Sequence, residues 1–188
     1  MSSNFYRPDD WEKSYFEKSL KTALPSDLNK SPEKYKGQLI HLVGIVDSAY
    51  AETKNDSVTL TFVLENKYWD YIEDYSIQDE VMFVSPKGEG KFLVTVPAMT
   101  ATESEAFKNF PSEKKLFLVY GNFNGIATNF PLITAQQVKY IDYKWYSTAI
   151  FSYEIKRDSN GEVEPDKKGH LQITNFAFQK VAKKGQNK

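Results

Sequence analysis

The sequence predicts an all-β protein with an N-terminal helix, in which one sheet curls into a small closed barrel. Segments rich in valine, isoleucine, threonine and aromatic residues follow one another from residue 37 to residue 157. The first segment is apolar on both faces, so it must be covered on two sides. Glycine stands inside two of the strand patterns, at Gly44 and Gly121. Glycine weakens a strand but lets it bulge or bend sharply, as a strand does when it serves both halves of a curled sheet.

The two-sided character of the first strand is visible residue by residue. One face carries Leu39, Val43 and Ile45, and the other carries Ile40, Leu42 and Val46. The strand therefore does not alternate simply between apolar and polar residues, which favours a barrel over a sheet that has one solvent-exposed face. The alternative architecture is an open antiparallel sheet packed by the N-terminal helix.

The first 30 residues are expected to form a helix and a connector. Pro8, Asp9 and Asp10 are typical of a helix start, and apolar residues then recur at helical spacing: Trp11, Tyr15, Phe16 and Leu20. We predict an amphipathic helix over residues 8–21. Pro25 and Pro32 should block regular structure in the connector, apart from one turn at "SPEKY".

The order of the remaining elements indicates the type of barrel. Strands are expected at residues 37–50, 57–65, 80–85, 91–96, 115–123, 131–144 and 147–157, with a short helix at 102–110. A five-stranded Greek-key barrel of the OB type, with a helix between its third and fourth strands, fits this order. Because there are more than five strands, a C-terminal hairpin must extend the barrel. Residues 31–180 are thus expected to form one domain, and 181–188 a flexible tail.

Composition excludes several classes of site. The 188 residues include no cysteine, which excludes disulfides, thiolate zinc sites and a cysteine nucleophile. Lysine and arginine total 24 against 25 acidic residues, so the whole molecule does not attract nucleic acid or anionic lipid. The only arginines are Arg7 and Arg157, whereas phosphate and base recognition favours the rigid arginine fork. No segment approaches the length of a membrane span, and the first 20 residues are too charged for a signal peptide.

Four segments, in order, resemble the Slp-type outer-membrane lipoproteins. They are "SPEKYKGQLIHLVGIVDS", "SPKGEGKFLV", "KKLFLVYGNFNG" and "FPLITAQQVKYIDYKW", which together span roughly residues 31–146. The succession of the segments carries the resemblance, since no single one is specific. The chain departs from the family pattern at Lys114 and Lys115, where a glycine is expected, and in "NKYWDYIEDY" and residues 147–188, which have no recognised counterpart.

The resemblance implies a protein that an N-terminal lipid anchors to the outer membrane, facing the periplasm. The lipidated cysteine would lie at or just before Met1. The family has no established catalytic residues, so the resemblance implies no catalytic site. We also expect no metal and no cofactor, since the two histidines lack an acidic helper at ligand spacing and the sequence has no nucleotide-binding loop motif.

Residues that could carry chemistry are few and scattered. His41 lies inside the first strand, where we interpret it as a partly buried residue with a hydrogen bond rather than a general base. His170 lies in a predicted turn. Asp70, Glu73 and Asp74 could offer oxygens to a hard cation, but they lack the loop and glycine of a calcium site, and we interpret "YWDYIEDY" as a solvated helical turn.

The best candidate for an interaction surface lies near the end of the predicted barrel. It comprises Tyr140, Lys144, Tyr146 and Lys156. Alternation places the first three of these residues on one face, where aromatic rings and lysines could stack and neutralise a single-stranded ligand. Asp142 interrupts the positive charge on that face, and rings in such a barrel more often fill its interior.

We therefore expect a non-enzymatic, lipid-anchored envelope protein of the Slp type, whose partner is an envelope protein or another envelope component. The alternative is an OB-fold module that binds single-stranded nucleic acid or another oligomeric ligand, against which the scarcity of arginine counts. A hydrolase or metalloenzyme built on His41 or Asp70 is a third, weaker hypothesis.

Overall fold

The computed structural model describes residues 6–54, 57–74, 79–99, 104–142, 146–148 and 150–179. Three short helices come first: α1 (Lys13–Lys18), α2 (Pro25–Lys30) and α3 (Pro32–Tyr35). The strands are β1 (Leu39–Lys54), β2 (Ser57–Asn66), β3 (Trp69–Asp74), β4 (Asp79–Val84), β5 (Lys91–Met99), β6 (Leu116–Ala127), β7 (Phe130–Ile141), β8 (Tyr146–Thr148), β9 (Ile150–Ile155) and β10 (Ile173–Gln179). The protein is therefore mostly β, as the sequence predicts, with only short helices.

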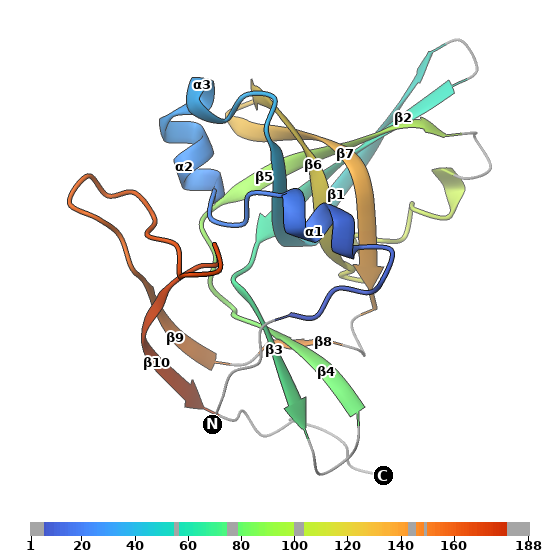
Figure 1. The fold of residues 1–188 in the computed structure, drawn as a ribbon. Coiled ribbons are helices and arrows are strands. Elements are labelled where there is room, and N and C mark those ends of the chain that lie inside the picture. Colours follow the sequence, from blue (N-terminus) through green and yellow to red (C-terminus); the bar gives the residue numbers. More distant parts are fainter. Residues whose placement is uncertain are drawn as a thin grey trace.

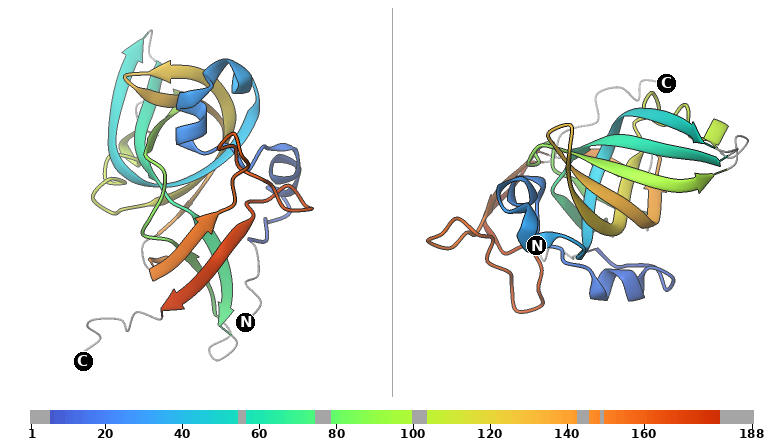
Figure 2. Two further views of the ribbon diagram at one scale, coloured as in Figure 1. Left: turned by 90° about the vertical axis from the view of Figure 1, so that its left-hand side faces the viewer. Right: turned by 90° about the horizontal axis from the view of Figure 1, so that it is seen from above.

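Five of the strands form a mixed sheet that closes in a ring (Figure 1). Their order is β1-β2-β5-β7-β6, and β6 pairs back with β1 from Ile45↔Leu116 to Leu39↔Asn122. Only β5 and β7 run parallel, while the other neighbours are antiparallel. Seen from above, the strands curve around a shared interior (Figure 2). The alternative of an open antiparallel sheet is thus wrong.

The remaining strands form two smaller sheets below the ring in Figure 1. One has the order β3-β4-β8, and the other pairs β9 with β10. The C-terminal hairpin predicted from the sequence is therefore present, but it forms a sheet of its own and does not extend the ring. The "YWDYIEDY" segment is also not a helical turn, because β3 pairs with β4 from Trp69↔Val84 to Asp74↔Asp79. Strand pairing outweighs the local preference of so short a segment.

Two apolar clusters lie on the two sides of the ring. The larger one is built around the fully buried rings of Phe62, Phe92, Phe117 and Phe123. The smaller one contains Phe16, Leu116, Leu118 and Tyr120. The first strand supplies both, as its pattern predicts: Ile40, Leu42 and Val46 join the larger cluster, while Val43 and the partly buried Ile45 join the smaller one. Burial on both faces thus explains why simple alternation fails in β1.

Gly121 and Gly44 both lie where strands approach closely, but only Gly121 lies at a bulge. The pairing of β6 with β7 shifts by one residue between Tyr120 and Gly121. A side chain at Gly121 would meet the carbonyl oxygen of Thr134 and lie 2.6 Å from the Cγ2 atom of Ile133. Gly44 pairs regularly, and the bulge in β1 falls between Val46 and Ser48. The expected kink at Gly44 is therefore wrong, and the glycine is instead needed because a Cβ atom there would lie 2.9 Å from the carbonyl oxygen of Glu65.

The helices are shorter than predicted. The segment predicted as a helix over 8–21 forms a turn and then α1. This helix ends at Lys18, because Leu20 already pairs with β1 through its N–H, which donates to the Leu39 carbonyl at 2.9 Å. Pro25 opens α2 rather than blocking structure, since proline fits the first helical turn, and the turn expected at "SPEKY" is confirmed as α3, which begins at Pro32. In the segment predicted as a helix over 102–110, residues 104–110 are described. After two helical residues they form turns, which continue to residue 114. The expected tail, 181–188, lies outside the described residues.

Candidate functional site

Of the residues predicted to form one interaction surface, the structure exposes Tyr140 and Lys156 and buries Tyr146. Tyr140 on β7 is 52% exposed, with its ring 5.1 Å from that of Phe110. Tyr146 is only 3% exposed, and its hydroxyl donates to the carbonyl oxygen of Lys114. Lys156 is exposed and pairs with Glu164 at 2.5 Å. Lys144 lies outside the described residues. Only Tyr140 of the predicted set thus presents an aromatic ring to solvent among the residues described.

A buried polar cluster holds the N-terminal segment against the ring. We call Tyr6, Asp9, Glu12, Tyr120 and Lys139 the Glu12 cluster. The fully buried carboxylate of Glu12 accepts hydrogen bonds from the hydroxyls of Tyr6 (2.7 Å) and Tyr120 (3.0 Å). It also accepts one from the Asp9 backbone N–H (2.9 Å). Since Tyr120 is on β6, these bonds tie the chain before α1 to the ring.

Lys139 supplies the positive charge of the Glu12 cluster. Its ammonium nitrogen lies 3.0 Å from the Glu12 carboxylate and 2.6 Å from the Asp9 carboxylate, and it also donates to the Tyr6 hydroxyl (2.9 Å). Burial, reinforced by the neighbouring Glu12 carboxylate, raises the pKa values of both Tyr6 and Tyr120. Both hydroxyls therefore remain protonated donors. A buried charge needs such partners, because its desolvation costs several kcal/mol.

His41 lies beside this cluster and is almost fully buried. Its ring stacks on that of Tyr120, with centroids 4.5 Å apart and planes inclined by 17°. Its Nδ1 atom lies 3.3 Å from the Val119 carbonyl oxygen. Burial, followed by the nearby charge of Lys21, lowers the pKa of His41 to about 3. The imidazole is thus neutral near pH 7.

We expect His41 to make the protein less stable as the pH falls. The unfolded chain binds a proton at this histidine below about pH 6.5, while the folded protein binds it only near pH 3. The unfolded state therefore holds more protons in between, and the free energy of unfolding falls by about 1.4 kcal/mol per pH unit. Urea unfolding at pH 7.5 and pH 5 measures this slope. His41→Phe keeps a ring but cannot titrate, so equal slopes for the two proteins would contradict the assignment.

A narrow cleft next to His41 has room for about one water molecule. It is lined by Lys21, Leu24, His41, Leu42, Val43, Asn66, Lys67, Tyr68 and Leu171. The polar groups around it have partners: Lys67 bonds Glu65 (2.6 Å) and the Pro86 carbonyl oxygen (2.9 Å), and the Asn66 amide donates to the Val43 carbonyl (3.0 Å). Lys21 donates to the Ser19 carbonyl (3.0 Å) and lies over the Phe16 ring. This cleft is too small for an organic substrate.

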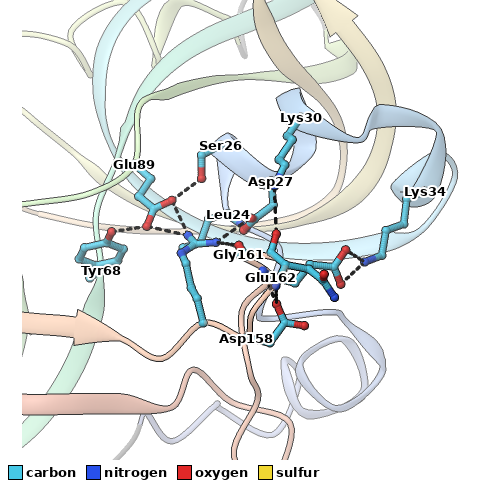
Figure 3. A network of polar contacts seen from close by, with 12 residues as sticks. Leu24, Ser26, Asp27, Lys30, Lys34, Tyr68, Glu89, Asp158, Gly161 and Glu162 are labelled. Carbon is cyan, nitrogen blue, oxygen red and sulfur yellow. Dashed lines mark hydrogen bonds and ion pairs between the residues drawn. The ribbon is translucent and has the colours of Figure 1, made fainter.

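A second polar network fixes the segment between β9 and β10 to the rest of the molecule (Figure 3). We call Ser26, Asp27, Tyr68, Glu89 and Arg157 the Arg157 network. Arg157 donates through Nη2 to both oxygens of Glu89 (3.0 and 2.9 Å) and through Nη1 to Asp27 (2.9 Å). The Glu89 carboxylate also accepts hydrogen bonds from the hydroxyls of Tyr68 (2.6 Å) and Ser26. α2, the loop before β5 and the C-terminal segment therefore meet at one guanidinium group.

An ion pair between α3 and the C-terminal segment reinforces this attachment. Lys34 in α3 donates to both carboxylate oxygens of Glu162, at 2.8 and 2.7 Å.

Burial alone would raise the pKa of Glu89, but the hydrogen bonds from Ser26, Tyr68 and Arg157 outweigh it and lower that pKa. Glu89 is therefore charged at neutral pH. Arg157 bridges two carboxylates with two nitrogen atoms, Nη2 to Glu89 and Nη1 to Asp27, whereas a lysine has only one nitrogen to offer.

Replacing Arg157 with alanine should release the segment of residues 156–172 while leaving the ring folded. The variant leaves the partly buried carboxylates of Glu89 and Asp27 without their cation, at a cost of about 1–3 kcal/mol. Hydrogen exchange should then accelerate in this segment and not in β6. Lys156→Ala is the matched control, because that lysine is exposed and has one ion pair. Unchanged exchange in the Arg157 variant would show that the network does not hold the segment.

The other residues singled out in the sequence do not converge on a reaction centre. Within the described residues, no group of three or more histidine, aspartate or glutamate side chains is placed to hold a metal ion. Asp70, Glu73 and Asp74 lie on β3. The Nδ1 atom of His170 lies 3.9 Å from the Asp166 carboxylate in a turn of the C-terminal segment. No helix in the described part of the chain is long and apolar enough to cross a membrane.

Sequence reasoning missed Glu12, Lys139 and Arg157 as organising residues. Glu12 reads as a polar residue of an amphipathic helix, although its spacing of four residues from Phe16 places both on one helical face. The scarcity of arginine could have pointed to Arg157. In a chain with many lysines, an arginine in a loop indicates a site at which the several nitrogen atoms of a guanidinium group are needed. No protein-family model matches the chain, and no curated protein matches it either.

Proposed function

We propose that this chain is a non-enzymatic interaction module of the cell envelope, built on an OB-like barrel and tethered by an N-terminal lipid to the periplasmic face of the outer membrane. The observation that carries the barrel assignment is the strand order β1-β2-β5-β7-β6 with one parallel pair. A five-stranded Greek-key barrel has a closed order of this kind. The segments that resemble the Slp-type lipoproteins include β1 and β6, which carry Gly44 and Gly121 at close strand contacts.

The polar clusters support binding rather than a reaction. In the Glu12 cluster, the carboxylate is fully buried and its oxygens are occupied by Tyr6, Tyr120 and the Asp9 backbone. In the Arg157 network, the guanidinium is shared between two carboxylates. Both sites fasten segments of the chain to the ring. What remains for a partner is the outer surface, including the exposed ring of Tyr140 beside Lys115, which is itself paired with Asp142 and Glu113.

The envelope proposal is tested by following the product of the native gene, expressed with its own upstream codons. Growth with a clickable palmitate analogue should label the product, and fractionation should place it with the outer membrane. The chain as printed, expressed from Met1, is the control and should remain unlabelled. An unlabelled native product outside the membrane fractions would overturn the proposal.

The second candidate is a module that binds single-stranded nucleic acid. The observation that favours it is the same strand order, because OB barrels bind such ligands through the face of their second and third strands and the adjoining loops. Tyr50, 48% exposed near the loop between β1 and β2, could stack on a base. Titration with a labelled oligonucleotide at about 50 and 200 mM salt should show affinity falling steeply, and less affinity for Tyr50→Ala. Absence of binding at low salt would exclude this candidate.

A further inference from the structure

Among the residues that the structure describes, none pairs with the outer half of β1 on the side away from β2, so we treat this half as an open strand edge. β6 pairs with β1 only as far as Ile45, and beyond it Val46 N–H donates to the Lys115 carbonyl, 2.9 Å. From Ser48 to Lys54, β1 pairs with β2 on its other side. Figures 1 and 2 show this end of β1 and the start of β2 projecting past the ring. Residues 47–54 are exposed, apart from the half-buried Ala49.

The pairing of β1 with β2 determines which backbone groups of this edge face solvent. Lys67 N–H donates to the Val43 carbonyl, so the odd-numbered residues of β2 direct their N–H and C=O groups toward β1. Beyond the bulge, the partners of these odd-numbered residues are Ser48, Tyr50, Glu52 and Lys54. Ala49, Ala51 and Thr53 therefore direct their N–H and C=O groups away from β2, along the open edge.

The edge carries little of the protection that natural edge strands use. Such strands are commonly guarded by proline, inward-pointing charges, bulges or lysine. In β1 the bulge lies at the inner end of this edge, where Asp47 forms an ion pair with Lys91. The lysine of the edge, Lys54, lies at its outer end. Between them, the three outward-facing residues are small. Such a row of outward-directed backbone N–H and C=O groups can pair with another strand.

We propose that a second copy of this chain pairs antiparallel with β1 along this edge, with the two-fold axis at Ala51. In this register, Ala51 faces Ala51 of the partner copy, and Ala49 faces Thr53 in both directions. Each facing pair can exchange two N–H···O bonds, so every outward group of the three residues finds a partner. On the other face of the strands, Tyr50 stands opposite Glu52 and Ser48 opposite Lys54.

Side-chain charges disfavour one of the two neighbouring registers, and the bulge, which interrupts the regular backbone pairing, disfavours the other. Like charges directly opposite each other in a sheet are destabilising. Sliding one copy by two residues toward the tip would place Glu52 opposite its own copy. Sliding it the other way would bring Asp47, at the bulge, opposite Thr53. The edge is thus self-complementary in one arrangement, which is what an isologous two-fold contact requires.

The size of the contact indicates a weak dimer. An edge of about eight residues buries less area than the roughly 1,200 Å² of a stable interface. A dissociation constant on the order of 100 µM is therefore expected. Lateral pairing would join the two rings into one continuous sheet through their projecting strands.

Sedimentation of the whole chain between about 5 and 500 µM tests the proposal, with the parent expected to shift from monomer to dimer over this range. Ala51→Lys and Ala51→Glu each place like charges at the two-fold axis and should remain monomeric. A one-to-one mixture of the two should dimerise again, because opposite charges then meet at the axis. Asn109→Lys, in an exposed turn, is the control for the added charge and should behave as the parent.

A parent protein that stays monomeric at 500 µM would overturn the proposal. The occupant of the edge would then be an extended segment of another protein. A dimer that the two Ala51 variants do not weaken, or that their mixture does not restore, would equally overturn it, because the contact would then lie elsewhere. Circular dichroism of each variant establishes that the ring remains folded, since residue 51 lies on a solvent-exposed edge.

Discussion

Replacing Glu12 with alanine is expected to lower the free energy of unfolding by about 3–5 kcal/mol. The substitution removes the acceptor of two buried tyrosine hydroxyls and leaves the ammonium group of Lys139 beside an empty space. A buried donor without a partner pays its full desolvation cost. Urea unfolding followed by tryptophan fluorescence measures the loss.

Glu17→Ala is the matched control for this change. Glu17 is exposed on the same helix, so its removal should alter stability by less than about 0.5 kcal/mol. A second variant, Lys139→Met, should also be destabilising, because it leaves the carboxylate of Glu12 buried with its cation removed. If Glu12→Ala unfolded with the same free energy as Glu17→Ala, the Glu12 cluster would not be what holds the N-terminal segment.

Gly121→Ala should destabilise the protein by about 3 kcal/mol, near the upper end of overpacking effects. The added methyl group collides with the Thr134 backbone and with the Ile133 side chain of β7, at the bulge where the strands shift register. Backbone atoms cannot move aside as the end of a flexible side chain can. Thermal unfolding monitored by circular dichroism measures the effect.

Gly44→Ala serves as the graded comparison. The Cβ atom there meets the Glu65 carbonyl oxygen and a ring carbon of Phe92, each at 2.9 Å, so a smaller loss than at Gly121 is expected. Equal stability of Gly121→Ala and the parent would show that β6 and β7 can separate at the bulge without cost. The close approach would then not be a requirement of ring closure.

The ring could be predicted from the sequence because its signal is local. The double-sided burial of β1 is encoded in consecutive residues, and the structure divides Ile40, Leu42 and Val46 from Val43 and Ile45 in the predicted way. The predicted exposure of Tyr146 beside Tyr140 is wrong, because alternation does not continue across an interruption of the strand. β7 ends at Ile141 and β8 begins at Tyr146, so the face on which Tyr146 lies does not follow from that of Tyr140.

The polar clusters could not be predicted because their partners are remote. Glu12 bonds Tyr120, 108 residues further along the chain, and Arg157 bonds Asp27, 130 residues earlier. Helical periodicity describes which residues share a face, but it does not contain the acceptor or donor that a distant strand will bring. Without the distant partner, a polar residue on the buried face of a helix is predicted to be exposed to solvent.

The distance along the chain between Glu12 and its partners has a consequence for the order of folding. Tyr120 on β6 and Lys139 on β7 follow Glu12 by 108 and 127 residues. The carboxylate of Glu12 therefore stays in water, and α1 cannot take its final place, until both strands have joined the ring. A truncated chain that ends before β6 should accordingly leave residues 6–20 open to protease, even where β1 and β2 have already paired.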